Sequence, residues 1–238
     1  MRRSRKIPLF GFLALVIACG TPVQQTEKRV EAATPPPSPA KRAVMTEPAT
    51  DLASRLEAKG AASFFNYMVR PDVVDAFWSE PNSRQNLENL VRDTSASPLA
   101  RFLACEVLFE KEFLFIGSVG PEVIAPVYTY ALQNNLTGLA NSWGLLYEHN
   151  DVGPVGSNLT TLGQEALPAI LELLNDERVL LEYEGSEEAT VGNAYKFRIK
   201  DFAAYYISKI TRKPLAYHAD TAARDKAIEA LRATLNEP

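Results

Sequence analysis

One stretch of the chain, from Leu99 to Ile116, is apolar on most sides when it is drawn as a helix. A helix that is apolar nearly all round belongs in the centre of a protein, because no face of it suits water. Ser97-Pro98 stands directly before it and has the sequence of a helix start, with a capping serine followed by a first-turn proline. The sequence therefore predicts a central helix with further helices packed around it.

Apolar residues recur at helical spacing through most of the chain from Asp51 onward. We expect one all-α domain over residues 51–238, long enough for a sizeable core. Two segments interrupt the expected helices. One is a structured loop at 136–157, held by Trp143, and the other is an acidic connection at 175–193. The other expected helices are a first from Asp51 to Met68, loosened at Gly60, a short second at 73–78, a third around 87–91, one from Pro121 to Leu132, one near 159–174 that pauses at Gly163, one from Tyr195 to Thr211, and a last from Thr221 to Leu235.

Two helix pairs show a weak internal repeat. Their first helices match at an offset of 83 residues and their second helices at an offset of 99. The matched residues are Leu87, Leu90 and Asp93 with Ile170, Leu173 and Asp176, and Arg101, Ala104, Cys105 and Leu108 with Lys200, Ala203, Ala204 and Ile207. Each pair resembles a HEAT-like repeat, in which small residues let the paired helices approach and apolar rows bury against the next pair. The resemblance implies helical hairpins stacked as a short HEAT-like α-solenoid, and an irregular helical bundle is the alternative.

Residues 1–18 contain a basic start and a short apolar run, the two leading parts of a secretory signal. The run is shorter than the roughly 20 apolar residues that span a bilayer as a helix. It ends in Val16-Ile17-Ala18-Cys19, which resembles the lipobox of bacterial lipoprotein signal peptides. That resemblance implies cleavage between Ala18 and Cys19, a diacylglycerol on the Cys19 thiol and an acyl chain such as palmitate on the new amino terminus. An ordinary secretory signal is the alternative.

Residues 19–50 form the expected lipidated N-terminus and a disordered linker. Six prolines and no Phe, Tyr, Trp, Leu or Ile stand between residues 20 and 50, so this segment cannot bury enough apolar area to order itself. We interpret it as a tether, and a Pro-rich recognition motif at Pro35-Pro36-Pro37 and Pro39 is the alternative. By the lipoprotein resemblance, Gly20 after the cysteine implies the outer membrane, with the domain facing the periplasm.

The chain that remains after cleavage carries 21 Lys and Arg against 29 Asp and Glu, a net charge of −8. An acidic protein does not suit nucleic acid, whose binding requires basic patches. It also repels anionic lipid, so the acyl chains at Cys19 would provide the membrane attachment. Cys105 is the one other cysteine, and no disulfide can form within the domain.

Catalytic motifs are missing from the sequence, which has no HExxH, CxxC, Gly-rich phosphate loop or Gly-x-Ser-x-Gly. Cys105 with His149 or His218 could form a nucleophilic pair, but a cysteine in so apolar a helix is better interpreted as a core residue. Glu148, His149 and Asp151 have suitable types for a metal site, yet they are also ordinary loop residues. We therefore predict no catalytic residue, no metal and no cofactor.

The acidic connection is the extra segment of the second repeat, and it carries Glu182, Glu184, Glu187 and Glu188. Insertions between repeat helices often map to a binding face, so these residues form the candidate interaction loop. A solvated charged loop is the alternative. We expect a lipid-anchored envelope protein that binds a protein partner or supports an assembly without catalysis. An envelope hydrolase with an unrecognised site and an accessory or immunity-type protein are the other possibilities.

Overall fold

The computed structural model describes residues 49–66, 68–147, 151–185 and 187–235, all within one compact unit, Val44–Pro238. In these residues the chain forms α-helices and three short 3₁₀-helices, and no strand apart from an isolated bridge between Leu145 and Asp151. The predicted all-α fold is confirmed. The helices are α1 (Ala49–Phe65), α2 (Arg70–Trp78), α3 (Ser83–Arg92), α4 (Pro98–Lys111), α5 (Phe115–Val119), α6 (Pro121–Gln133), η1 (Ala140–Ser142), α7 (Pro154–Thr161), η2 (Gly163–Ala166), α8 (Leu167–Glu172), η3 (Leu173–Asn175), α9 (Glu187–Ala194), α10 (Ile199–Thr211) and α11 (Thr221–Leu235).

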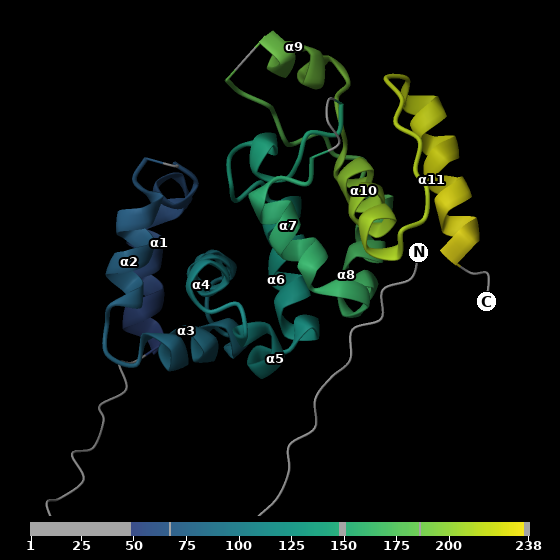
Figure 1. The fold of residues 1–238 in the computed structure, drawn as a ribbon. Coiled ribbons are helices and arrows are strands. Elements are labelled where there is room, and N and C mark those ends of the chain that lie inside the picture. The colour runs from purple at the N-terminus through teal and green to yellow at the C-terminus, as the bar shows by residue number, and fades with distance from the viewer. Residues whose placement is uncertain (1–48, 67, 148–150, 186, 236–238) are drawn as a thin grey trace, which may run out of the picture. The chain divides into compact units, whose positions relative to one another are not determined.

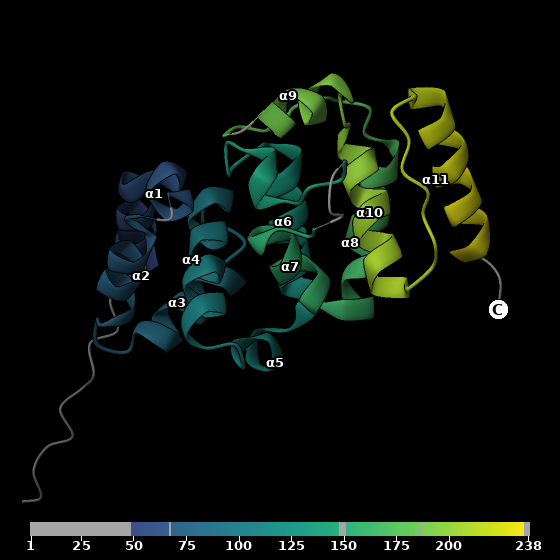
Figure 2. The ribbon, with the colours of Figure 1, turned by 45° about the horizontal axis from the view of Figure 1, so that its top comes forward.

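The helices follow one another across this unit in approximately their chain order (Figures 1 and 2). In both views α1 and α2 lie at one end and α11 lies at the other. Contacts lead from α1 to α4, from α4 to α6, from α6 to α8, from α8 to α10 and from α10 to α11. The domain is therefore a row of helix layers in which the two ends stay far apart.

The central helix α4 begins as the sequence predicts. The Ser97 hydroxyl accepts a hydrogen bond from the Ala100 amide at 3.1 Å, which satisfies one of the free N–H groups of the first turn. Eight of its 14 residues are buried, including Phe102 and Cys105. Since it contacts α1, α2, α3 and α6, α4 forms the centre of the first half of the row.

The prediction that this helix continues to Ile116 is wrong. The helix ends at Lys111, and Glu112 leaves the helical conformation at φ −147°. The chain turns there, so Phe115 enters the core whereas Phe113 and Leu114 are 56% and 75% exposed. Apolar composition alone does not locate such a turn, because it suits a buried helix and a buried turn equally.

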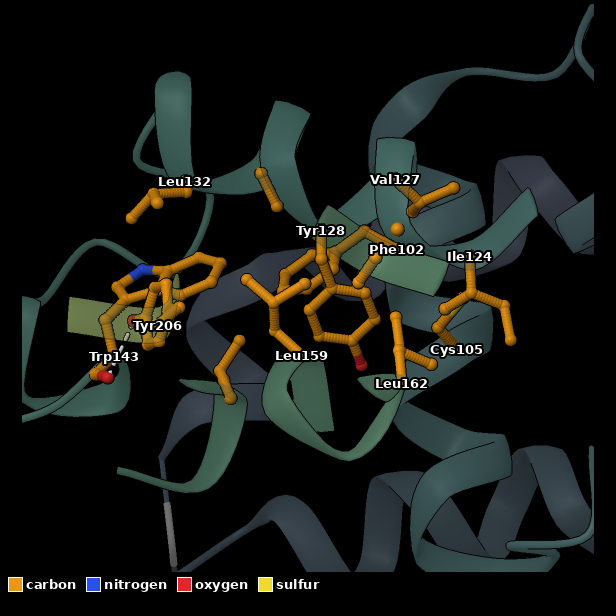
Figure 3. Packing of buried hydrophobic residues seen from close by; sticks show 14 of the residues in the cluster. Phe102, Cys105, Ile124, Val127, Tyr128, Leu132, Trp143, Leu159, Leu162 and Tyr206 are labelled. Carbon is orange, nitrogen blue, oxygen red and sulfur yellow. Dashed lines mark hydrogen bonds between the residues drawn. The ribbon is translucent and has the colours of Figure 1, made fainter. Parts of the chain in front are cut away.

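Aromatic rings fill the middle of the core (Figure 3). Phe102 has its ring centroid 5.3 Å from that of Tyr128 in an edge contact and 6.4 Å from that of Trp143. Trp143 is fully buried, donates its indole N–H to Thr137 at 2.8 Å, and accepts the Tyr206 hydroxyl on its backbone carbonyl at 2.7 Å. The predicted role of Trp143 in holding the loop after α6 is confirmed.

Several helix boundaries differ from the sequence prediction. The breaks at Gly60 and Gly163 are confirmed, since both glycines have φ near +70° and α1 kinks at the first. Met68 lies outside the first helix and is 70% exposed. The helix predicted from Tyr195 starts four residues later, because Lys196 adopts φ +50°. α7 begins inside the predicted loop, and α9 lies inside the predicted connection.

The turns that follow the first helices of the two matched pairs have similar geometry. Asp93 has φ −73° and ψ 99°, and Asp176 has φ −90° and ψ 102°. Each carboxylate accepts a hydrogen bond from the amide two residues later, Ser95 at 2.9 Å and Arg178 at 3.1 Å. The two aspartates therefore end their helices in the same way, at positions that the internal repeat matches.

Candidate interaction site

The backbone of the acidic connection is fixed to the loop after α6 by hydrogen bonds from both the backbone and a side chain of that loop. The Ala140 amide donates to the Glu182 carbonyl at 2.8 Å. The Asn141 side chain donates to the Glu184 carbonyl at 3.1 Å and accepts from the Glu184 amide at 2.9 Å. Asn193 makes the same pair of bonds with the backbone of Tyr183. Residues 182–184 of the connection are therefore held in place by several hydrogen bonds.

Residues along the connection alternate between the core and solvent. Leu181 and Tyr183 are buried, whereas the side chains of Glu182 and Glu184 are exposed. The structure thus presents two of the four predicted acidic residues on a fixed backbone. The side chains of the other two, Glu187 and Glu188 at the start of α9, lie outside the described residues, as do Ala18 and Cys19.

The side chain of Tyr183 anchors the connection to the loop that ends at Tyr147. Its hydroxyl donates to the Gly144 carbonyl at 3.0 Å, and its ring meets the Tyr147 ring edge-on at a centroid distance of 4.8 Å. Burial raises the pKa of the Tyr183 hydroxyl well above its ordinary value. Gly192 of α9 lies directly against both rings, where a side chain would not fit. Through Tyr183 and Gly192, the connection therefore packs directly against the ring of Tyr147.

Beside this contact lies a small aromatic pocket of about 70 Å³. Three separate segments form its walls, the loop ending at Tyr147, the segment that leads into α10, and the segment that leads into α11. Tyr147, Tyr195 and Phe197 form a chain of ring contacts, with centroids 6.3 and 5.4 Å apart. The residues that line the pocket are Leu146, Tyr147, Tyr195, Phe197, Tyr217, His218 and Ala219.

Arg224 of α11 holds two of these walls together, the segments that lead into α10 and α11. It is 4% exposed, and its guanidinium lies over the Phe197 ring, 5.1 Å from the centroid. The same group donates to the carbonyls of Tyr195 at 3.0 Å, His218 at 3.0 Å and Ala219 at 2.8 Å. Five donors in a planar fork allow one arginine to bind several carbonyls at once. The buried cation of Arg224 therefore holds in place the pocket segments that carry Tyr195, His218 and Ala219.

An ionic network links Arg224 to other parts of the domain. Arg198 pairs with Asp201 at 3.0 Å and with Asp225 at 2.8 Å, and Lys200 pairs with Asp225 at 2.8 Å. Hydrogen bonds from Arg198 and Lys200 lower the pKa of Asp225 to about 2. The network consists of Arg198, Lys200 and Arg224 with Glu177, Asp201 and Asp225. It connects the turn after η3 with α10 and α11, and its formal charges balance.

Of the suggested nucleophilic pairs, the structure describes only Cys105 and His218, and it does not bring these two together. Cys105 is fully buried among core residues of α4 (Figure 3), and burial raises the pKa of its thiol well above the ordinary value. His218 is exposed at the edge of the pocket. His149 lies outside the described residues. Cys105 therefore has the environment of an inert core thiol.

Of the three suggested metal ligands, the structure describes only Asp151. Glu148 and His149 are not among the described residues, and Asp151 is exposed, with its backbone carbonyl accepting from the Leu145 amide at 2.7 Å. Across the described ranges, no three His, Cys, Asp or Glu side chains are placed to hold a metal ion. Every helix in that part of the chain is too short or too polar to cross a bilayer.

Sequence reasoning did not find the aromatic pocket. Its tyrosines come from three connecting segments that are far apart in the chain, so no local spacing links them. One signal was available, because Tyr147, Tyr183, Tyr195 and Tyr217 all stand in predicted or actual connections instead of on apolar helix faces. No family model, curated protein or solved structure matches the chain. The pocket is therefore interpreted from its own chemistry.

Proposed function

We propose that the chain is a bacterial lipoprotein whose helical domain is held at the outer membrane, facing the periplasm, by acyl chains on Cys19 and a Pro-rich tether. The lipobox-like Val16-Ile17-Ala18-Cys19 and the composition of residues 19–50 support this proposal. Two acyl chains or more give stable membrane attachment, whereas one chain gives marginal binding. The domain itself would be a short HEAT-like stack, supported by the matched turns at Asp93 and Asp176.

The proposed molecular function is binding of a protein partner, without catalysis, at the aromatic pocket and the connection beside it. The observation that carries the proposal is the position of Arg224, which joins two of the three pocket walls from a buried site. Tyrosine and arginine are enriched among the residues that contribute most to protein interfaces. Rigid aromatic walls also lose little conformational entropy on binding. The exposed carboxylates of Glu182 and Glu184 would contribute orientation and association rate.

Site-specific photocrosslinking tests this function in the native membrane. A photoreactive residue at Lys196, which is exposed between Tyr195 and Phe197, should capture a defined partner. The same residue at Glu172, exposed on α8, provides the matched control. Capture that is specific to position 196 and is lost in a Tyr217→Ala background supports the proposal. Equal capture at both positions, or none at either, contradicts it.

A further inference from the structure

The chain between η3 and α9 is bonded to the rest of the domain along one edge. Its carbonyls accept hydrogen bonds at every second residue, Arg178 from the Ile199 amide at 2.9 Å, Leu180 from the Asn135 side chain at 3.0 Å, Glu182 from the Ala140 amide at 2.8 Å and Glu184 from the Asn141 side chain at 3.1 Å. A period of two is that of an extended strand, in which neighbouring peptide groups point to opposite edges. Residues 178–184 therefore have a second edge, which carries Val179, Leu181 and Tyr183.

The second edge has unpaired backbone groups. Asn193 binds the N–H and the C=O of Tyr183, at 2.8 and 3.0 Å, and closes the edge there. The N–H and C=O groups of Val179 and Leu181 have no hydrogen-bond partner in the part of the chain that the structure describes. Val179 is 48% exposed, whereas the Leu181 side chain is buried and holds the segment on the core. An unpaired strand edge is a template for a strand of another chain, which adds to it by main-chain hydrogen bonds.

The two residues with free backbone groups match each other in antiparallel pairing. When a second copy of the segment pairs with the first about Leu180, Val179 lies opposite the second copy's Leu181, and Leu181 lies opposite its Val179. Opposite residues of an antiparallel ladder exchange both N–H···O=C bonds at every second pair, so each free group finds a partner. We propose that residues 178–182 pair edge to edge with the same residues of a second copy of this chain, in this register.

Charge selects this occupant and this direction. Alternate residues of a strand share a face, so Arg178, Leu180 and Glu182, which are all exposed, lie together. The register places Arg178 opposite Glu182 of the second copy, and the symmetry of the contact repeats this pair. Opposite charges in cross-strand pairs stabilise a sheet, and like charges destabilise it. A parallel pair in register would instead place Arg178 against Arg178.

This contact is separate from the aromatic pocket. None of residues 178–182 lines the pocket, so self-association goes beyond the partner binding proposed above and does not rest on it. Arg178 binds Asp176 of its own chain through Nε and Nη2, and its guanidinium has further donors for the second copy's Glu182. The contact is symmetric and small, so the dimer should be closed and weak in solution.

Disulfide trapping tests the register. The chain for this test is residues 19–238 with Cys19→Ser and Cys105→Ala, which removes the other thiols. Leu180 faces its counterpart in a non-hydrogen-bonded pair, where Cα atoms are about 4.5 Å apart, within the roughly 4.4–6.8 Å that a disulfide requires. Leu180→Cys should therefore give a covalent dimer on a non-reducing gel after mild oxidation. Leu171→Cys is the matched control, because Leu171 and Leu180 are both 38% exposed, and it should stay monomeric. Equal yields of dimer overturn the proposal.

Charge variants test the partner. In sedimentation velocity, the 19–238 chain with Cys19→Ser should associate as its concentration rises. Arg178→Glu alone and Glu182→Arg alone should each weaken association about tenfold or more, because both cross-strand pairs become like-charged. An equimolar mixture of these two variants should associate again, since the mixed pair has opposite charges at both positions. Glu172→Arg, at an exposed residue of α8, makes the same charge change outside the segment and should not alter association.

Circular dichroism and thermal melting establish that each variant is folded. A parent chain that stays monomeric, or a mixture that associates no more than its two components, overturns the proposal. Association that survives in both charge variants and is lost in Tyr217→Ala would place the self-contact at the pocket, and it overturns the proposal as well. Partner capture at position 196 should be unchanged in the Arg178→Glu chain, so failure of the dimer and failure of the pocket are distinguishable.

Discussion

The Tyr128 hydroxyl donates a hydrogen bond of 2.5 Å to the Glu106 carboxylate, and both side chains are buried. The same carboxylate also accepts from the Asn158 side chain at 3.0 Å and from Arg70 at 3.2 Å. These four residues come from α6, α4, α7 and α2. A buried carboxylate is tolerated because each donor offsets part of its desolvation cost. This network therefore joins helices from both halves of the row.

Replacing Tyr128 by Phe should destabilise the domain by about 1–3 kcal/mol, because it removes a donor from a buried charged acceptor. Chemical denaturation followed by circular dichroism measures the change. Tyr130→Phe is the matched control, since Tyr130 is 42% exposed on the same helix and should change stability by less than about 0.5 kcal/mol. Equal effects of the two substitutions would show that the Glu106 network does not contribute to stability.

Cys105 should be chemically silent in the folded protein. It is fully buried, and burial raises the pKa of its thiol, so little reactive thiolate forms at neutral pH. In a mature chain with Cys19→Ser, a thiol reagent should label the protein only after denaturant is added. Cys105→Ala should cost about 1–2 kcal/mol of stability and leave pocket binding unchanged. Rapid labelling of the folded chain would contradict the interpretation as a core residue.

The sequence predicted the fold class well because apolar periodicity reports burial directly. The bounds of α11, Thr221–Leu235, and the cap of α4 follow from local residues, and both are present. The end of α4 could not be predicted, since charged residues such as Glu110, Lys111 and Glu112 also occur inside helices, and the turn there depends on which of Phe113 and Phe115 the core accepts. Local signals thus locate helix starts better than they locate ends inside apolar runs.

The candidate site was only partly predictable. Acidic composition identified the connection that bears Glu182 and Glu184, because charge is a property of the segment itself. How its backbone is held was not predictable, since Asn141 binds it from 43 residues away. Arg224 likewise has no sequence neighbour that marks it as a support for Phe197. Such roles depend on tertiary contacts, which composition does not contain.

Cys19 provides the direct test of membrane attachment. Cys19→Ala should abolish metabolic labelling with palmitate and leave the precursor uncleaved by the lipoprotein signal peptidase, because both steps use the cysteine. Labelling followed by gel electrophoresis measures the first effect and the precursor size measures the second. Cys105→Ala is the matched control and should label normally. Labelling that persists in the Cys19→Ala chain would refute lipidation at this residue.

Gly192 should be required for the close packing of the connection against the Tyr147 ring. A Cβ atom there would overlap the Tyr147 ring and approach a Tyr183 ring carbon to 2.7 Å. Gly192→Ala should therefore loosen the connection and speed hydrogen exchange at the Tyr183 and Glu184 amides, which Asn193 and Asn141 protect. The control is Gly117→Ala, where no atom lies within 4 Å of the added carbon. Unchanged exchange in the Gly192 variant would show that α9 shifts freely.

The acid sensitivity of the domain should depend on Asp225. Hydrogen bonds from Arg198 and Lys200 lower its pKa to about 2, against about 3.9 in an unfolded chain. A carboxyl group whose pKa is lowered by folding adds stability above its unfolded pKa. That stability is lost as the pH falls from about 4 to about 2. The side chain of Asp225 is 42% exposed, so screening by solvent limits the effect.

Asp225→Asn should consequently lower the free energy of unfolding by about 0.5–1 kcal/mol at neutral pH, with no difference from the parent chain near pH 2. Urea denaturation across this pH range measures both values. Glu229→Gln is the matched control on the same helix, because Glu229 is 72% exposed and its contact with Arg232 is 3.6 Å long. A difference that persists unchanged at pH 2 would mean that Asp225 stabilises α11 by packing and not by its charge.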